Sequence, residues 1–274
     1  MLNNLPPPSI CSKPELQLLF LTLCGASHLS LLQQCLYSLY ISWEFLPRIQ
    51  IVSDGTLSLS KLNEALSWWP GSISFTTWED SILYHQRLGR KYLVEFAEHN
   101  VIGRKLAVIL QFGEQECTLW CDTDILWFQQ IPEITQEFLM SSNQIFKVSE
   151  DFQAAYDFKL INRGLSYLCE PPFINTGLVL IHAELYQNYK LEKLLKYAID
   201  SSNHFTEQTI LAEVAYRTGF NYWTKTEIEC SVDDQLSLSP TYIGKNSIAR
   251  HYIGPIRHLF WRDALALRLN IRKK

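Results

Sequence analysis

The sequence predicts an α/β fold: a largely parallel, Rossmann-like central sheet flanked by helices, in a single continuous domain covering residues 1–274. Strand-like and helix-like runs alternate through the first half of the chain, as they do in βαβ units. The chain can also fill one large core, since 47% of its 274 residues are hydrophobic and 13% are aromatic. The second half is less regular, so the first half is expected to be the more Rossmann-like part.

The individual elements follow from periodicity and from breaker residues. Leucines recur at helical spacing from Leu29 to Leu39, and Ser30 with Gln33 fits a capping box at the start of that helix. Pro70 and Gly71 close the next helix. In chain order we expect strands at 16–23, 48–55 and 72–78, a strand that ends at Asp122 and Asp124, and strands at 143–151 and 173–182. We expect a helix that begins at 29 and further helices at 59–69, in the region 83–111, at 183–200 and at 206–218.

The charge of the chain argues against a nucleic-acid partner. Its 24 Lys and Arg against 28 Asp and Glu give a net charge of −4, which offers no generally basic surface. The section 241–274 differs, because eight basic residues against one acid, Asp263, give it +7 and leave −11 for the rest. We therefore expect an anion to meet the C-terminal section.

The cysteines and the apolar runs indicate a cytoplasmic protein. The seven cysteines are odd in number and show no Cys-x-x-Cys or zinc-type spacing, so they are expected to be reduced thiols. The run 16–23 lacks a basic region before it and is better explained as a strand than as a signal sequence. No run approaches the roughly 20 apolar residues that span a bilayer, which disfavours a lumenal enzyme with its own anchor.

Two aspartates, Asp122 and Asp124, lie one residue apart in the otherwise apolar run TLWCDTDILWF (118–128). Side chains two apart on a strand point to the same side, so the pair could share one cation. Mg²⁺ and Mn²⁺ take such oxygen ligands and still leave room for substrate phosphates. In open α/β sheets, the carboxyl ends of the strands border the ligand crevice. Aspartates that cap a turn or a helix would explain the same short pattern.

Three later motifs give the aspartate pair its context. In order, the four signals are Asp122 with Asp124, the strand Phe173-Ile-Asn175-Thr-Gly177 followed by aliphatic residues, Glu207-Gln208 at the start of a helix, and His251-x-x-Gly254-x-x-Arg257. Together they resemble the GT-A glycosyltransferases, and within them the retaining family eight, which includes bacterial lipopolysaccharide galactosyltransferases and glycogenin. The chain departs from that family's pattern, which has Asp in place of Glu207, Lys in place of Arg257, and Pro-Trp where His258-Leu-Phe-Trp261 stands. The identity of the donor is the property that these departures put in question.

The resemblance implies a metal-dependent transfer of a sugar from a nucleotide-sugar donor, with a family bias towards UDP and with retention of anomeric configuration. Asp122, Asp124 and His251 would hold Mn²⁺ or Mg²⁺, with Asp122 also reaching the ribose. Gly254 would let the backbone approach the diphosphate, and Arg257 would bind the diphosphate as it leaves.

The remaining predicted site residues contact the donor or the acceptor. The nucleoside would meet Thr22, Cys24, Gly25 and Asp54 at the ends of the first two strands, and Lys105 would approach the diphosphate. Gln208 and Glu207 would line the reactive face of the sugar, and Asn175 would contact donor or acceptor. The acceptor is a carbohydrate, a lipid-linked molecule or a protein. On this view residues 15–125 form the nucleotide-binding half, 126–262 the acceptor-side half and 263–274 a basic tail.

Several of the predicted site residues also have a purely structural explanation. His251 would be a core histidine, Asn175 to Gly177 a strand kink, and Glu207 with Gln208 an exposed helix turn. Lys105 would be a solvated helix charge, and Asp54 with Gly55 a common turn.

Two other functions compete with the transferase. A haloacid-dehalogenase-type phosphatase also carries Asp-x-Asp, but usually near its start and with Thr or Val where this chain has Leu126. A non-catalytic relative that binds a sugar nucleotide is the second alternative.

The C-terminal tail suggests peripheral contact with an anionic membrane. On a helix, the apolar residues would lie on one side and the basic residues on the other. The apolar side holds Leu265, Leu269 and Ile271, and the basic side holds Arg262, Arg268, Arg272, Lys273 and Lys274. A terminal helix that packs on its own domain is the alternative.

Overall fold

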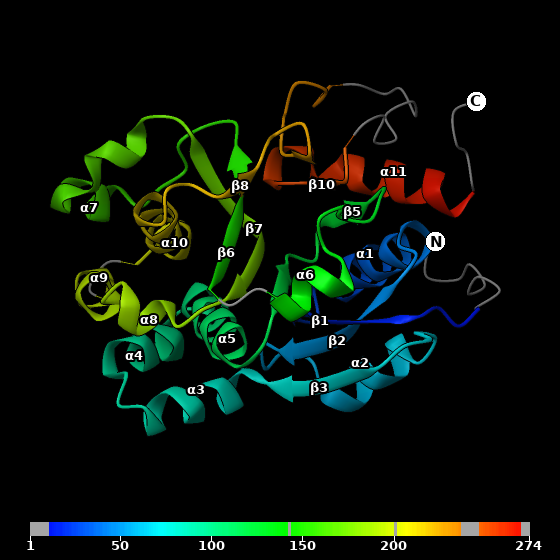
Figure 1. The fold of residues 1–274 in the computed structure, drawn as a ribbon, viewed down its shortest axis with the longest axis horizontal. Helices are drawn as coiled ribbons and strands as arrows, with labels where there is room; N and C mark the ends of the chain where they lie inside the picture. The colour runs from blue at the N-terminus through cyan, green and yellow to red at the C-terminus, as the bar shows by residue number, and fades with distance from the viewer. Residues whose placement is uncertain (1–10, 142–143, 200–201, 237–246, 270–274) are drawn as a thin grey trace.

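The computed structural model describes residues 11–141, 144–199, 202–236 and 247–269. Its centre is a seven-stranded sheet in the order β3-β2-β1-β4-β7-β6-β8, beside a three-stranded sheet in the order β5-β10-β9 (Figure 1). The strands are β1 (Glu15–Cys24), β2 (Leu46–Ser53), β3 (Ile73–Thr77), β4 (Thr118–Cys121), β5 (Ile125–Trp127), β6 (Ile145–Asp151), β7 (Phe173–His182), β8 (Tyr222–Trp223), β9 (Ile228–Glu229) and β10 (Ala249–His251).

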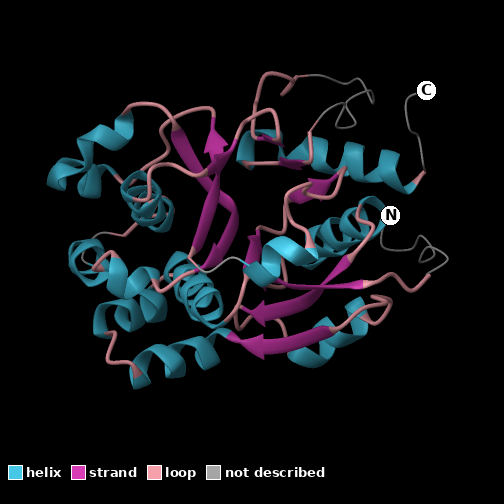
Figure 2. Ribbon diagram, viewed as in Figure 1, coloured by secondary structure: helices cyan, strands magenta, loops and turns pink. Residues whose placement is uncertain are grey.

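Helices cover the large sheet on both faces (Figure 2). They are α1 (Leu29–Ser42), α2 (Leu59–Leu66), α3 (Trp78–Arg87), α4 (Lys91–His99), α5 (Val101–Gln115), α6 (Gln136–Ser141), α7 (Phe158–Leu160), α8 (Leu185–Asn188), α9 (Leu191–Ala198), α10 (Thr206–Arg217) and α11 (Arg257–Arg268). Short irregular helical turns lie at Ile161–Leu165, Ser166–Cys169 and Gly254–Ile256.

Alternating side chains of the central strands fill two separate cores. Phe20 and Ile51 belong to the apolar cluster that includes residues of α1 and α2, whereas Leu21 and Val52 belong to the cluster that includes residues of α5 and α10. A strand buried on both faces reads as a nearly continuous apolar run, which is why the sequence of β1 resembles a signal sequence. The predicted α/β fold with helices on both faces is confirmed.

Strand β7 runs opposite to the other strands of the large sheet. Strands β3, β2, β1 and β4 are parallel, but β7 is antiparallel to both β4 and β6. Strand β6 therefore runs in the same direction as β4, and the carboxyl ends of both strands lie at one edge of the sheet. The sequence predicted a largely parallel sheet, which the first four strands supply in full.

Two local predictions are corrected. The capping box of Ser30 and Gln33 is wrong, because α1 begins at Leu29 with His28 at the cap position, and the amide of Gln33 instead donates to the carbonyl of Ala65. The helical region 83–111 is three helices. Gly89, with φ of 69°, ends α3 in the left-handed region, and Asn100 caps the start of α5 through its side-chain oxygen.

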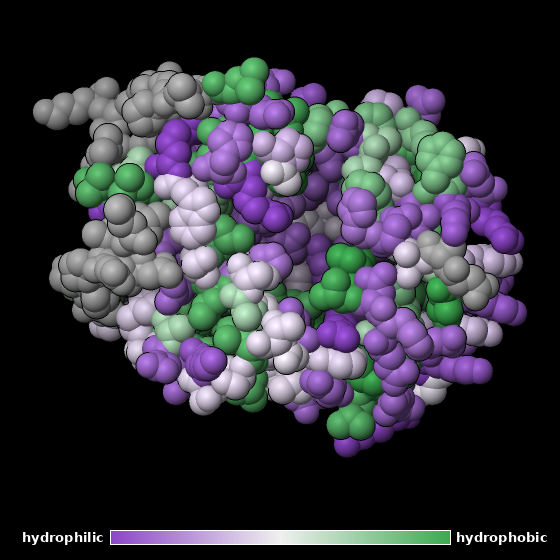
Figure 3. Space-filling view, turned by 180° about the vertical axis from the view of Figure 1, so that it is seen from behind, coloured by the Kyte–Doolittle hydropathy of each residue, from purple (hydrophilic) through white to green (hydrophobic). Residues whose placement is uncertain are grey.

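Helix α11 packs on the rest of the chain through Leu259, Phe260 and Ala264. Within the predicted tail, Leu265 and Leu269 are 42% and 55% exposed. Five residues of the predicted tail, 270–274, lie outside the described residues, among them Ile271, Arg272, Lys273 and Lys274. Among the described residues, no helix has the length and apolar character needed to cross a bilayer. Figure 3 shows hydrophobic and hydrophilic residues interspersed over the face seen from behind, with a hollow near its centre.

Candidate functional site

The two aspartates lie just beyond strand β4, in the turn that leads to β5. The backbone N–H of Asp122 donates to the carbonyl of Gly177 on β7 at 2.7 Å, and the carbonyl of Asp124 accepts from the N–H of Tyr252 at 2.9 Å. The turn is therefore fixed from both sides by backbone bonds to segments far away in the sequence. The expectation that both aspartates lie at the carboxyl edge of the sheet is confirmed, although they follow the strand instead of continuing it.

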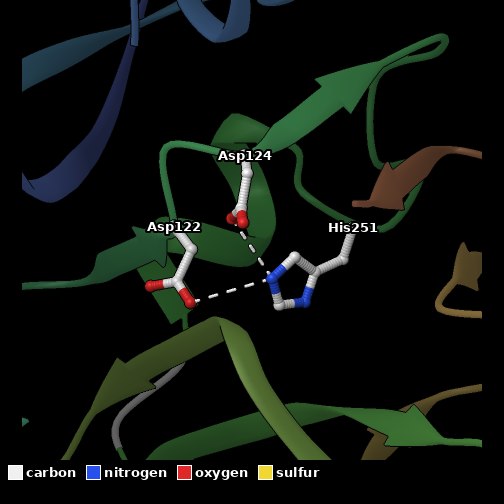
Figure 4. A group of neighbouring side chains, drawn as sticks. All are labelled: Asp122, Asp124 and His251. Carbon is white, nitrogen blue, oxygen red and sulfur yellow. Dashed lines mark ion pairs between the residues drawn. The ribbon is translucent and has the colours of Figure 1, made fainter. Parts of the chain in front are cut away.

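His251 completes a three-residue cluster with these carboxylates. It is the last residue of β10, which pairs with β5 so that His251 lies opposite Ile125, next to Asp124 in the chain. Its Nε2 atom is 3.2 Å from Oδ1 of Asp124 and 3.9 Å from Oδ2 of Asp122 (Figure 4). One ligand atom from each residue lies within 4.8 Å of the others. The predicted convergence of the three side chains is confirmed, and carboxylate oxygens with an imidazole nitrogen are ligand atoms that divalent cations take.

Asp124 and His251 shift each other's pKa in opposite directions. Burial alone would raise the pKa of Asp124, but His251 and Arg257 outweigh it and hold that pKa well below its usual range. Burial alone would lower the pKa of His251, but Asp124 outweighs it and raises that pKa. Asp124 is therefore a carboxylate, and its negative charge is available to attract a cation.

The ring of His251 lies directly over Gly177. A Cβ atom at Gly177 would be 2.4 Å from both Cε1 and Nδ1 of the ring. The glycine of the Asn-Thr-Gly motif is thus required for the close approach of β7 to His251. The strand-kink alternative also holds, because the pairing of β7 with β6 shifts register between Val179 and Asn175.

Gly177→Ala is expected to displace the ring of His251 and to lower Mn²⁺ affinity about 10- to 100-fold, the usual cost of disturbing the support of a metal ligand. Isothermal titration with Mn²⁺ measures this change, and circular dichroism checks that the variant is folded. A folded alanine variant that binds Mn²⁺ as tightly as the wild type would show that the ring position is unimportant.

Lys105 and Glu207 are buried beside the cluster, so their alternatives as solvated surface residues are wrong. Nζ of Lys105 is 3.1 Å from Asp122, 3.5 Å from Glu207 and 3.0 Å from the carbonyl of Thr176. Burial alone would lower the pKa of Lys105, but the two carboxylates outweigh it and raise that pKa. Lys105 therefore neutralises part of the negative charge between Asp122 and Glu207.

Glu207 predicts a pH dependence of stability. Burial raises the pKa of Glu207 from the usual 4.5 to about 7, with Lys105 opposing this shift and Asp122 adding to it. The native protein keeps this proton where the unfolded chain has lost it, so the free energy of unfolding falls as pH rises from 4.5 to 7, by at most about 3 kcal/mol. Glu207→Gln should remove this slope. Urea unfolding of the wild type and of Glu207→Gln at pH 5 and pH 8 tests this prediction. If the difference in the free energy of unfolding between the two proteins is the same at both pH values, the prediction is wrong.

Arg257 and Gly254 lie on the other side of Asp124. Nη2 of Arg257 donates to Oδ2 of Asp124 at 2.7 Å, while 47% of the arginine side chain is exposed. No atom lies within 4 Å of the Cβ position of Gly254, among the described residues, so the backbone there faces open space. A half-exposed guanidinium next to open backbone is suited to an anion, and the binding of a diphosphate there stays a prediction.

These residues surround one cavity of about 570 Å³. The predicted residues in its wall are Lys105, Asp122, Asp124, Asn175, Glu207, Gln208, His251, Gly254 and Arg257. Apolar residues complete the wall, among them Phe152, Phe205 and Ile253.

Four predicted residues lie at the ends of β1 and β2 and do not line this cavity. Thr22 is fully buried, and burial raises the pKa of the Cys24 thiol to about 12. Asp54 accepts hydrogen bonds from Thr56 and lies against Gly25, where a Cβ would be 2.0 Å from its carboxylate. Their contact with a nucleoside stays a prediction.

Asp151 is a site residue that the sequence analysis missed. It is the last residue of β6, is 5% exposed, lines the cavity and accepts a hydrogen bond from Asn175. The signal was present, because an acidic residue ends a predicted strand just as Asp122 follows one. Its significance depends on β6 and β4 running in the same direction, and the sequence does not reveal this direction.

The fold and the aspartate turn define the structural class: the chain has the GT-A glycosyltransferase fold. Mouse xyloside xylosyltransferase 1, in its apo form, is similar over 88% of this chain and 99% of its own, with 12% identity and a TM-score of 0.58. The galactosyltransferase LgtC, in complex with donor and acceptor sugar analogues, is similar over 90% and 95%, with 14% identity and a TM-score of 0.56.

The bifunctional glycosyltransferase WbbM gives a TM-score of 0.54 at 11% identity, over 92% of this chain and 48% of WbbM. No protein-family model and no curated protein matches the sequence. At these identities the likeness shows the fold, and the activity has to be argued from the residues of the site.

Proposed function

We propose that the protein is a metal-dependent glycosyltransferase that moves a sugar from a nucleotide-sugar donor, a UDP-sugar by resemblance, to an acceptor with retention of anomeric configuration. One observation carries the proposal. Asp122, Asp124 and His251 converge at the edge of a GT-A sheet, and Arg257 contacts the same Asp124 from the rim of the same cavity. A site for a cation is thereby joined to a site for an anion, as a metal-bound diphosphate requires.

The three clustered residues would hold the ion, Mn²⁺ or Mg²⁺. When bound, such an ion supplies positive charge that screens the diphosphate and stabilises it as a leaving group. Arg257 would bind a diphosphate oxygen through its fork of N–H groups, and the open backbone at Gly254 would admit that phosphate. Lys105 holds Asp122 in place from the opposite side. The side chains of Arg257 and Lys105 thus flank the two carboxylates that would anchor the donor.

The sugar would lie near Glu207 and Gln208 on the first turn of α10. Thr176 Oγ1 donates to one oxygen of Glu207, whose other oxygen is buried and has no hydrogen-bond partner in the part of the chain that the structure describes. The amide of Gln208 is oriented by donating to the carbonyl of Ala155 at 2.8 Å. A donor hydroxyl would satisfy the buried oxygen of Glu207, which supports the placement of the sugar here. The acceptor would be a carbohydrate, a lipid-linked molecule or a protein.

A thermal-shift panel tests this function. We expect UDP and one or more UDP-sugars to raise the melting temperature only in the presence of Mn²⁺, because a ligand at 100 times its Kd adds about 2.7 kcal/mol of stability. Slow hydrolysis of the stabilising donor identifies an enzyme, whereas stabilisation without hydrolysis identifies a non-catalytic binder. Release of phosphate from p-nitrophenyl phosphate would instead support the phosphatase. A panel with no metal-dependent shift would contradict the proposal.

Location in the cytoplasm, with peripheral contact to anionic lipid through the tail, is part of the proposal. Leu265 on α11 and Leu269 directly after it are exposed apolar residues. Arg268 stacks on the ring of Tyr37, and Arg262 pairs with Asp263, so part of the predicted basic side contacts the protein itself. These contacts hold that part of the helix on its own domain, and the exposed Leu265 and Leu269 remain available to a membrane.

We expect the protein to float with anionic vesicles at low salt, and Leu265→Ser with Leu269→Ser to reduce the bound fraction severalfold. These exposed positions are preferable to truncation, which would remove buried residues of α11. Uncharged vesicles are the control. A wild-type protein that never floats would eliminate the membrane contact without affecting the transferase.

A further inference from the structure

A chain of hydrogen bonds runs behind His251, away from the carboxylates. Nδ1 of His251 is 2.9 Å from Oδ1 of Asn175, and the Nδ2 group of Asn175 donates to Oδ2 of Asp151 at 3.0 Å. Oδ1 of Asp151 accepts from the backbone N–H of Phe152 at 2.7 Å. All three side chains are more than 90% buried. These hydrogen bonds therefore link the end of β6, the first part of β7 and the end of β10.

The bonds fix which way the amide of Asn175 points. Oδ1 of Asn175 also accepts from the backbone N–H of Gly177 at 2.8 Å, so this atom faces two donors. The backbone N–H of Gly177 can only donate, so it requires the amide oxygen on its side and leaves the NH₂ group for Asp151. A flipped amide would place its NH₂ group against the N–H of Gly177 and its oxygen against a carboxylate oxygen. The network thus has one consistent assignment.

The orientation of Asn175 in turn determines the role of each ring nitrogen. Because Oδ1 of Asn175 can only accept, Nδ1 of His251 must carry a proton. Nε2 is then the atom directed at Asp122 and Asp124. A metal-binding histidine usually has its other N–H bonded in this manner, which holds the ring and makes the ligand nitrogen more basic.

These contacts give Asn175 a different role from the predicted contact with donor or acceptor. Only 6% of the residue is exposed, and both polar atoms of its side chain are engaged within the protein. Without breaking one of these bonds, a substrate could accept only from the second N–H of the amide.

We propose that Asp151 and Asn175 are positioning residues that hold the ring of His251 with Nδ1 protonated and Nε2 directed at Asp122 and Asp124. The inference rests on the proposed function only for its consequence, the affinity for a metal ion. The position of the ring is a property of the protein without metal.

The first test uses NMR of protein labelled with ¹⁵N-histidine and freed of metal by EDTA. One histidine should show an Nδ1 proton that exchanges slowly, and its assignment to His251 follows from its loss in His251→Gln. Asn175→Leu, which fills a similar space without an acceptor, should abolish slow exchange of the Nδ1 proton. A wild-type His251 with no protected Nδ1 proton would overturn the inference, as would a protected one that persists in Asn175→Leu.

The second test is titration with Mn²⁺. We expect Asn175→Leu to bind about 10- to 100-fold more weakly than the wild type. Asp151→Asn should lose less, because asparagine keeps one acceptor but cannot accept from both Phe152 and Asn175. The matched control is Ser149→Ala, a buried residue of the same strand whose hydroxyl donates to the carbonyl of Leu178 and lies outside the chain of bonds. It should retain wild-type affinity.

The two tests separate the inference from the proposed function. An Asn175→Leu variant with wild-type Mn²⁺ affinity overturns the positioning role, and so does an equal loss in Ser149→Ala, which would indicate general damage to the strand. A wild type with the protected Nδ1 proton but no affinity for Mn²⁺ supports the ring position and refutes the metal site of the proposed function.

Discussion

Asp124→Asn is expected to lower metal-dependent hydrolysis of the donor about a thousandfold. The carboxylate contacts both His251 and Arg257 and is itself a proposed ligand, so its loss removes charge from the whole cluster. Charge stabilisation by a bound metal is worth several kcal/mol, and about 4 kcal/mol corresponds to a thousandfold in rate. The rate of UDP-sugar hydrolysis with saturating Mn²⁺ measures the effect.

An exposed carboxylate supplies the control for this variant. Glu137 lies on α6 and does not line the cavity, so Glu137→Gln should hydrolyse the donor at the wild-type rate. If Asp124→Asn retains more than about a tenth of the activity, the ion is held elsewhere and the ligand assignment fails.

Arg257→Ala is expected to reduce turnover by ~10²- to 10³-fold with little loss of Mn²⁺ affinity. Groups that stabilise charge developing on a leaving group have effects of this size. The guanidinium already occupies one oxygen of Asp124, and its positive charge opposes a neighbouring cation, so removing it should not weaken metal binding. The result is a loss in kcat that is separate from the dissociation constant of the metal.

Arg257→Lys refines this prediction. Lysine keeps the charge but not the fork, and by resemblance it is the usual residue at this position, so we expect an intermediate rate. Parallel measurements of kcat and Mn²⁺ affinity in both variants are required. Equal losses of rate and affinity in Arg257→Ala would assign the arginine to the metal site instead of the leaving group.

The fold was predictable where apolar periodicity was strong. The predicted strand at 173–182 coincides with β7, and the predicted helix at 206–218 matches α10 (Thr206–Arg217) to within one residue. The region 83–111 was harder, because apolar residues continue through the breaks and only Gly89 and Asn100 mark the three separate helices. The direction of β7 was not predictable, since alternation along a strand is the same in parallel and antiparallel pairs.

The site was predictable from motifs but not from physical pattern alone. His251 could be paired with Asp124 only because a family resemblance joined segments that are far apart in the sequence. The burial of Lys105 was missed because a lysine on an amphipathic helix usually faces solvent, and its two acidic partners come from other elements. The role of Asn175 depends on its hydrogen bond to Asp151. This contact cannot be predicted without knowing how β6 and β7 pair.

Strand β10 comprises only three residues, Ala249–His251, and belongs to the small sheet with β5 and β9. Such a strand can open locally while the seven-stranded sheet stays folded, and opening would withdraw His251 from both carboxylates. Strand β10 pairs with both β5 and β9, and any opening of it lowers the apparent affinity for the ion by the fraction of molecules in which it is open. Amide hydrogen exchange at Arg250 and His251 should accordingly slow when Mn²⁺ is added, while exchange in β1 remains unchanged.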